Sequence, residues 1–442
     1  MARSPQLVLD GAVLAAEMIG ASKAVVVVHR GVREIVAEAV AERVRARSGR
    51  VRLEVRTAAD RFVAGQASAV VHWIQRGVPT PTATPPHLSR RGLRGAPTLV
   101  QNVETLAHLA LIARYGASWF RSAGTPAEPG SMLVTVLGAV RRPAVLEVEI
   151  GMPVGEVLEL AGGASAPPQA LLLGGYFGTW VDAAEAVGLP FSSAGLADLG
   201  AGPGAGLIAA LPAGACGLAE TARVVRYLAG ESAGQCGPCR FGLPAIAGEV
   251  ERLADGRGAD PGLLQRWLGQ VDGRGGCAHP GGVTGLVRSA LRTFGAELGR
   301  HAAGRCSGPA GVLPVPSACV PPAPPGGGRG PPRRGSGWTS SPATAGRCAP
   351  RRCPSSSPWT TGAFPSSAVR SCRPGCWPTR ARPSGRVPSS RSGSTRAVKA
   401  RTVRLYSPAI PVTDCPAGTC PAIDPYQGAL KASTPPFDLT IQ

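Results

Sequence analysis

Two cysteines near the middle of the chain have the type and spacing needed to hold a metal ion or an iron–sulfur cluster. Cys236 and Cys239 stand in the run Gly-Glu-Ser-Ala-Gly-Gln-Cys-Gly-Pro-Cys-Arg-Phe-Gly of residues 230–242. A Cys-x2-Cys pair on a turn of glycine and proline can direct both sulfurs to one side, where backbone N–H groups and Arg240 can stabilise thiolate charge. Cys277 lies in a second glycine-rich loop, Gly-Gly-Cys-Ala-His-Pro-Gly-Gly. These three residues predict a metal or cluster site.

Two other interpretations of these cysteines remain open. Cys236, Cys239, Cys277 and His279 together offer three thiolates and one imidazole, a donor set that suits a tetrahedral zinc ion. Cys277 and His279 are only two residues apart, so a single ion would require a sharply bent loop. The other interpretation is that the thiols bind nothing, and that the chain is a non-catalytic binding or scaffold module.

The distribution of the cysteines indicates a reducing compartment. None of the 12 cysteines precedes Cys216, whereas disulfide-rich secreted domains are small and rich in cysteine throughout. Asp10 and Glu17 interrupt the first apolar segment, so it does not resemble a secretory signal. No uninterrupted apolar stretch reaches the ~18–20 residues of a membrane span. We therefore expect a cytoplasmic protein without a transmembrane segment, able to associate peripherally with a membrane complex.

The first ninety residues have the pattern of a layered α/β domain. The spacing of apolar residues predicts helices over 7–19 and 32–47, and β-branched or alternating runs predict strands at 24–28 and 51–55. A further helix is expected over 62–74. Two strands are too few for a complete doubly wound sheet, so this pattern predicts only part of such a domain, with the chain beginning in mid-domain.

The following residues predict a mixed module and then a helical region. A connector over 78–96 leads into a long helix expected at 98–120. The residues that follow predict a small α+β module, with strands at 132–137, 144–149, 169–173 and 207–211 and a short helix at 154–160. From residue 220 to about 301 the pattern is helical again.

Two motifs resemble the flavoprotein subunit of bacterial NADH:quinone oxidoreductase, which takes hydride from NADH. Residues 231–242 are similar to the cluster loop of that family, E-S-C-G-x-C-x-P-C-R-x-G, and residues 97–107, Pro-Thr-Leu-Val-Gln-Asn-Val-Glu-Thr-Leu-Ala, are similar to its P-T-x-V-N-N-V-E-T-L-A. The resemblance extends over about 5–300. It implies that Cys236, Cys239 and Cys277 match three of the four ligands of a 4Fe–4S cluster.

One ligand of the family's cluster is replaced in this chain. Ala233 stands where the family has its first cysteine. Ser232, Cys216 or His279 could take that place, or the iron could take an exogenous thiolate or water. The resemblance therefore implies either a 4Fe–4S cluster or a 3Fe-type, incompletely ligated one.

The resemblance also implies a flavin site, with further departures. The family's glycine-rich flavin loop, G-R-G-G-x-G-F-P-x-G-x-K, is absent, and residues 62–69 align with Y-I-C-G-E-E-T-A but lack both glutamates. Gly65 and Asn102 are retained and would face a bound flavin, although a turn glycine and a helix cap explain them equally well. FMN and NAD thus belong to the family, and without the phosphate-cradling loop we do not expect this chain alone to bind them.

The C-terminal third differs from the rest in composition. Residues 306–442 carry 17 basic and three acidic side chains, and no acidic residue occurs between Glu297 and Asp414. This Arg/Pro/Ser-rich stretch lacks aromatic interleaving, which favours a disordered tail over a nucleic-acid-binding segment. From about residue 320 onward we interpret it as a shifted reading frame of GC-rich DNA. Permitted codons for 343–354 and 359–367, read one frame over, can give runs that resemble a small bacterial ferredoxin.

Together these patterns predict an α/β plus α+β protein in five parts. They are a partial flavoprotein-like α/β domain (1–90), a linker and helix (91–125), a ubiquitin-like β-grasp, soluble-ligand-binding-like domain (126–212), a helical iron–sulfur domain (213–305) and a disordered basic tail (306–442). The predicted function is one-electron relay from a flavin or NADH donor toward a ferredoxin or a quinone-reducing partner. We expect other redox subunits as partners and no nucleic acid.

Overall fold

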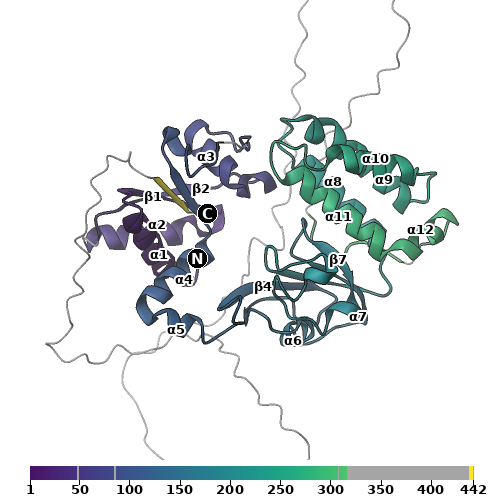
Figure 1. The fold of residues 1–442 in the computed structure, drawn as a ribbon, viewed down its shortest axis with the longest axis horizontal. Coiled ribbons are helices and arrows are strands. Elements are labelled where there is room, and N and C mark those ends of the chain that lie inside the picture. The colour runs from purple at the N-terminus through teal and green to yellow at the C-terminus, as the bar shows by residue number, and fades with distance from the viewer. Residues whose placement is uncertain (47–48, 84–85, 307, 316–437, 442) are drawn as a thin grey trace, which may run out of the picture. The chain divides into compact units, whose positions relative to one another are not determined.

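The computed structural model describes residues 1–46, 49–83, 86–306, 308–315 and 438–441 of the 442-residue chain. Figure 1 shows their helices and strands. The segment interpreted as a shifted reading frame lies outside the described residues, apart from 438–441. No helix in the described part of the chain is long and apolar enough to cross a membrane.

A four-stranded parallel sheet organises the N-terminal part. Its strands are β1 (Lys23–Val28), β2 (Arg52–Thr57), β3 (Thr98–Gln101) and β9 (Asp438–Ile441), in the order β2-β1-β9-β3. The nearly continuous valines of β1 suit a strand that is covered on both faces. The sheet therefore has two strands beyond the two that the sequence predicts, and β9 comes from the far end of the chain (yellow in Figure 1).

Helices cover both faces of β1. They are α1 (Pro5–Met18), α2 (Arg33–Arg45), α3 (Ala67–Arg76) and α4 (Val103–Tyr115), followed by the short α5 (Ala117–Phe120). Val26 packs in one cluster with residues of α1, α2 and α4, and Val27 packs on the opposite face with Val70 of α3. Gly11 allows α1 to approach α4 closely, because a Cβ there would lie 1.8 Å from the Leu106 carbonyl oxygen.

The helix expected at 98–120 is divided in the structure. Thr98–Gln101 forms β3, and the helix begins only after Asn102, whose side chain accepts the Thr105 N–H at 2.8 Å. The Thr-Leu-Val run suits a strand, and an asparagine cap marks the first turn of a helix. The prediction was wrong over this stretch because apolar residues at helical spacing continue into a short strand without a break.

A five-stranded mixed sheet follows. Its strands, in the order β5-β4-β8-β6-β7, are β4 (Ser131–Gly138), β5 (Ala144–Glu149), β8 (Leu207–Pro212), β6 (Pro168–Leu173) and β7 (Thr179–Asp182). The β4–β8 pair is parallel and the other pairs are antiparallel. Helices α6 (Val154–Leu160) and α7 (Ala183–Ala186) belong to the same region. The expected strands and the helix at 154–160 are confirmed, whereas β7 was missed.

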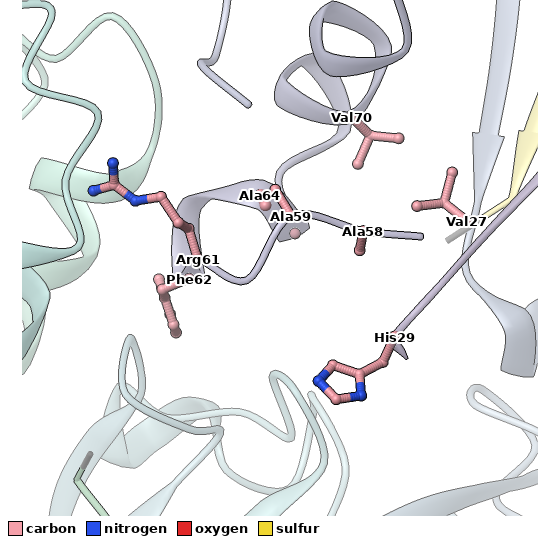
Figure 2. Close-up of a pocket in the computed structure, with 9 residues that line it drawn as sticks. Val27, His29, Ala58, Ala59, Arg61, Phe62, Ala64 and Val70 are labelled. Atoms are coloured by element: carbon pink, nitrogen blue, oxygen red, sulfur yellow. The ribbon is translucent and has the colours of Figure 1, made fainter. Parts of the chain in front are cut away.

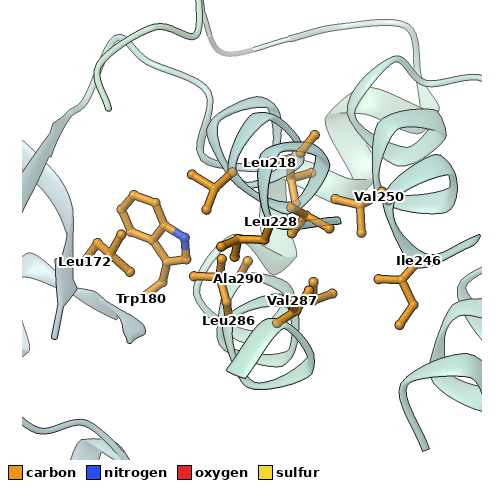
Figure 3. Packing of buried hydrophobic residues seen from close by; sticks show 14 of the residues in the cluster. Leu172, Trp180, Leu218, Leu228, Ile246, Val250, Leu286, Val287 and Ala290 are labelled. Carbon is orange, nitrogen blue, oxygen red and sulfur yellow. The ribbon is translucent and has the colours of Figure 1, made fainter. Parts of the chain in front are cut away.

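The helical region contains five helices among the described residues. They are α8 (Gly217–Gly230), α9 (Leu243–Ala254), α10 (Pro261–Val271), α11 (His279–Thr293) and α12 (Gly295–Ala302). Leu172 of β6 and Trp180 of β7 belong to the same buried cluster as Leu228 of α8 and Leu286 of α11, and Figure 3 shows these side chains together. The neighbouring Leu171 and Leu173 face the other side of the sheet, in a separate cluster. The five-stranded sheet and the helices therefore share a core.

Residues 308–315 are packed rather than disordered. Leu313 is buried, and the Cys216 N–H donates to the Pro309 carbonyl oxygen at 3.2 Å. The expectation of a tail beginning at residue 306 is thus wrong for this segment, and it is also wrong for β9. The run Gly-Val-Leu-Pro-Val at 311–315 supplies the apolar side chains that this segment buries.

Candidate functional site

The Cys-x2-Cys pair lies on a tight turn between two helices. After α8 ends at Gly230, the chain passes through a loop to Cys236 and then forms a π-helical turn, Pro238–Gly242, before α9. The Arg240 N–H donates to the Cys236 carbonyl oxygen at 3.0 Å and closes this turn. Single π-helical turns are frequent at functional sites because they redirect side chains locally. This one brings the two cysteine side chains together.

Backbone N–H groups surround the two thiols. Burial raises the pKa of Cys236, but N–H groups of Gly276 and Cys239 that point at its sulfur outweigh this effect and hold the pKa below its ordinary value. Burial, and next the proximity of Cys236, raises the pKa of Cys239 to about 12, although the Gly234 N–H points at its sulfur. Because N–H donors directed at sulfur stabilise cluster thiolates, this environment suits an iron–sulfur cluster.

Cys277 approaches the pair from the loop between α10 and α11. Its neighbour Gly276 donates to Cys236, and Cys277 itself is close enough to interact electrostatically with Cys239. All three residues are free thiols. The structure therefore brings together Cys236, Cys239 and Cys277, as the sequence predicts.

The zinc interpretation of this site is not supported by the geometry. Among the described residues, the one group of three or more ligand side chains whose donor atoms all lie within 4.8 Å of one another is Cys216, His301 and Cys306. Cys236, Cys239 and Cys277 do not form such a group, although Cys236 and Cys239 lie within hydrogen-bonding reach of each other.

His279 occupies the core beside the site. Its Nε2 atom lies 2.8 Å from the Leu228 carbonyl oxygen, and its ring packs edge-on against Phe62 and Phe177 at centroid distances of 5.9 and 5.2 Å. Burial lowers the pKa of His279, so the ring is neutral near pH 7. These contacts describe a packed core histidine rather than a fourth ligand.

The structure excludes one of the two other candidates for the fourth ligand and leaves the other open. Cys216 is buried at the start of α8 with Glu297 and His301, apart from the three cysteines, so its assignment as fourth ligand is wrong. Burial raises its pKa to about 12. Ser232 is half-buried in the loop before Cys236. Ser232 therefore remains a candidate.

A pocket lies at the carboxyl edge of the parallel sheet. It has a volume of about 340 Å³ and is lined by residues that follow β1 and β2 and by the start of α3: Val27, His29, Ala58, Ala59, Arg61, Phe62, Ala64, Gly65 and Val70. Figure 2 shows short alanine side chains between Phe62 and His29, with Arg61 extending away from His29. Open α/β sheets bind ligands at this edge. Most of the lining side chains are small and apolar, and Arg61 and His29 add polar groups.

Gly65 and Asn102 have different environments. Gly65 lines the pocket, and a Cβ at this position would meet no atom within 4 Å, so the backbone leaves open space there. Asn102 is exposed and caps α4, as the alternative explanation of this residue requires. The structure thus places Gly65, and not Asn102, in the pocket.

The pocket-lining segment contacts the loop that precedes the cysteines. Arg61 donates through Nη2 to the Ser232 carbonyl oxygen at 3.2 Å, and the Phe62 N–H donates to the Glu231 carboxylate at 2.8 Å. The Gln235 amide also donates to the Pro81 carbonyl oxygen at 3.0 Å. The sequence analysis assigned no role to His29 or Arg61. No motif contains these residues, and only their position after a strand of the parallel sheet indicates that they line a pocket.

Comparison with protein-family models divides the chain into three matched regions. Residues 1–111 match the Nuo51 FMN-binding domain, residues 133–175 match the SLBB domain, and residues 219–301 match the NADH-ubiquinone oxidoreductase-F iron–sulfur binding region. The last region contains Cys236, Cys239 and Cys277. The matches confirm the resemblance to the flavoprotein subunit of NADH:quinone oxidoreductase.

Individual relatives agree with these matches. The chain is 30% identical to the NADH-quinone oxidoreductase F protein of Mycobacterium tuberculosis over 319 residues, covering 69% of this chain and 72% of the relative. It is 27% identical to an NADH-quinone oxidoreductase F protein of Rhizobium meliloti, covering 68% and 75%.

Solved structures give the same result. A chain of the NAD+-reducing [NiFe]-hydrogenase in the H2-reduced state superposes with a TM-score of 0.62 at 30% identity. The match covers 68% of this chain and 52% of the hydrogenase chain, so this protein spans about half of its length. With these relatives and the arrangement of its cysteines, the chain belongs to the family of NADH-quinone oxidoreductase F proteins.

Proposed function

We propose that this chain is an iron–sulfur electron-transfer subunit in which Cys236, Cys239 and Cys277 hold a 4Fe–4S or 3Fe-type cluster. The convergence of three free thiols with backbone N–H donors is the observation that carries the proposal. An iron–sulfur cluster supplies one-electron transfer when it is bound. Ser232 or an exogenous ligand would complete the set where Ala233 provides no donor.

The chain's own residues would control the environment of that group. Gly234 and Gly276 direct N–H groups at the thiols, and the nearly complete burial of Cys239 excludes water from one side. Donors to sulfur and exclusion of solvent are the two levers by which a protein sets a cluster's reduction potential. The exposed Phe241 and Arg240 on the same turn leave the other side open to a partner.

The match to the FMN-binding domain replaces the expectation that this chain alone binds no flavin, and the pocket lined by Gly65 is the proposed place of the ring. Its apolar walls and open space beside Gly65 fit the ring, and Arg61 is the cationic side chain of the lining. His29 and Phe62 would flank the ring. Contacts of Arg61 and Phe62 with residues 230–232 link this pocket to the cysteine loop, as electron relay requires.

The domain division and the partners follow from this proposal. We infer a flavoprotein-like region up to about residue 90, a linker and helix to 125, a β-grasp region to 212 and a helical iron–sulfur region to 305. The donor would be a flavin or NADH bound by this chain or by a neighbouring subunit, and the acceptor a ferredoxin or other redox subunit. We infer no nucleic-acid partner and a cytoplasmic location, with peripheral association to a membrane complex.

Anaerobic purification of the full chain, followed by counts of iron and acid-labile sulfide, tests the proposal. We expect iron and sulfide in similar amounts, and loss of most of both in Cys239→Ser and Cys277→Ser. Cys306→Ser is the matched control because this cysteine is outside the proposed cluster site, and it should retain the iron. A folded wild-type chain without iron or sulfide after reconstitution would overturn the proposal.

A further inference from the structure

A second group of potential metal ligands lies outside the cysteine turn. The donor atoms of Cys216, His301 and Cys306 all lie within 4.8 Å of one another. Cys216 Sγ is 3.2 Å from His301 Nε2, and it is 3.4 Å from an oxygen of Glu297. The same carboxylate oxygen is 3.4 Å from His301 Nε2. Two sulfurs and one ring nitrogen therefore converge on one small volume, and a carboxylate oxygen of Glu297 lies beside the Cys216 sulfur and the imidazole.

From this convergence we propose a mononuclear zinc site formed by Cys216, Cys306 and His301, with Glu297 moving in as the fourth ligand. Zinc in proteins prefers four ligands of sulfur, imidazole nitrogen and carboxylate oxygen in a tetrahedron. Ligands about 2.3 and 2.0 Å from a tetrahedral ion lie about 3.5 Å apart. The separations among Cys216, His301 and Glu297 are 3.2–3.4 Å, close to that value, and Cys306 lies within 4.8 Å of Cys216 and His301. Movement of the exposed Cys306 side chain toward Glu297 would complete the tetrahedron.

The elements that carry these ligands hold them in place without an ion. Glu297 and His301 stand four residues apart on one side of α12, and both are nearly completely buried. Cys216 is the N-cap residue of α8, where the Ala219 N–H donates to its sulfur at 3.3 Å.

The loop that carries Cys306 is fixed against the same helix. The Cys216 N–H donates to the Pro309 carbonyl oxygen at 3.2 Å. Gly308 packs so closely on Gly214 that a Cβ there would lie 1.8 Å from the Gly214 carbonyl oxygen. Cys306 itself is exposed and provides the entry side of the site.

Charge balance also favours a divalent cation. One oxygen of Glu297 pairs with Arg300 at 3.0 Å, whereas the other faces the sulfur and the imidazole. Two thiolates and one carboxylate carry three negative charges, and a divalent ion with the Arg300 guanidinium carries three positive charges. Buried charges are stable when they are paired or coordinate a metal. The proposed site is thus electrically neutral.

Metal analysis of the full chain tests the site independently of the proposed cluster. We expect about one zinc ion per chain, lost in Cys216→Ser and His301→Ala but retained in Cys239→Ser, a variant that should lose iron instead. Cobalt substituted for zinc should show thiolate-to-cobalt charge-transfer absorption that disappears in Cys306→Ser. Because Cys306 is exposed, this variant separates loss of the metal from loss of the fold.

Two results would overturn the inference. One is a folded wild-type chain that binds neither zinc nor cobalt when its thiols are reduced. The other is a zinc content that is unchanged in Cys216→Ser and Cys306→Ser. Thiol counting under non-reducing conditions identifies the competing outcome, a disulfide between Cys216 and Cys306, which would also overturn it. Iron content in the same samples reports separately on the cluster.

Discussion

The fully buried carboxylate of Glu220 accepts the backbone N–H of Val312 at 2.5 Å. It also accepts N–H groups of Gly311 and Leu313, and it pairs with Arg223 at 2.8 Å. One side chain of α8 therefore anchors the segment that follows the helical region, close to the loop that carries Cys306. This segment is part of the fold, although the sequence predicts a disordered tail from residue 306 onward.

We predict that Glu220→Ala lowers the free energy of unfolding by about 3 kcal/mol, because backbone N–H groups lose a buried charged acceptor. Denaturant unfolding of the full chain measures this change. Glu251→Ala is the control, since this carboxylate pairs with Arg226 at the surface, and it should cost about 1 kcal/mol or less. Equal losses in the two variants would contradict the anchoring role.

The missing first cysteine leads to a second prediction. Ala233 directly precedes Gly234, whose N–H points at the Cys239 sulfur, so a cysteine at 233 would stand beside the proposed cluster. We expect Ala233→Cys to slow the loss of iron in air several-fold, because a fourth thiolate replaces a weaker or exogenous ligand. The decay of visible absorption after exposure to air measures the rate.

The same variant identifies the present fourth ligand. If Ser232 ligates iron, Ser232→Ala lowers the iron content of the wild-type chain but has no effect in the Ala233→Cys background. A double-mutant cycle of iron content measures this dependence. An equal effect of Ser232→Ala in both backgrounds would exclude the hydroxyl as a ligand.

Blocking the pocket should prevent flavin binding without unfolding the protein. A side chain at Gly65 meets open space, so Gly65→Leu is expected to weaken FMN binding at least about tenfold (about 1.4 kcal/mol). Quenching of FMN fluorescence by the full chain measures the affinity. Gly188→Leu, also at a position with open space but away from the pocket, serves as the control. Unchanged affinity in Gly65→Leu would place any flavin elsewhere.

Glu128 should make the region of the five-stranded sheet sensitive to acid. The N–H groups of Ala194 and Ser193 donate to its carboxylate at 2.9 and 3.0 Å and hold its pKa below the ordinary 4.5. The stabilisation is present above the unfolded value of 4.5 and is lost as the pH falls through the lowered pKa.

The pH dependence of thermal unfolding checks this prediction. Glu128→Gln should lower the melting temperature at pH 7 and flatten its decrease between about pH 5 and acid pH, where the wild-type carboxylate becomes protonated. Glu147→Gln is the control, because this carboxylate is exposed and accepts only one hydrogen bond within the described part of the chain, from the Ser131 hydroxyl. Identical pH profiles for wild type and Glu128→Gln would show that the two N–H contacts do not matter to stability.

The spacing of apolar residues was sufficient to predict a helix or strand where the pattern lies entirely within that one element. The valine run of β1 and the alternation in β2 predicted strands because a strand's burial repeats within a few residues. The apolar spacing of α1 and α6 predicted helices for the same reason. In contrast, β3 was hidden in a helical pattern, and β9 could not be expected, because its pairing partners β1 and β3 lie more than 300 residues earlier.

The sequence by itself determined the candidate cluster ligands and the family, because Cys236, Cys239 and Cys277 stand in turn-forming runs with a recognisable spacing. Only the tertiary structure decided which other groups meet. Cys216 lies 85 residues from His301 and is separated from the three cysteines, although its residue type made it equally available as a ligand. Spacing along the chain constrains only neighbours on one element, whereas the approach of distant side chains depends on how helices α8 and α12 pack in a shared core.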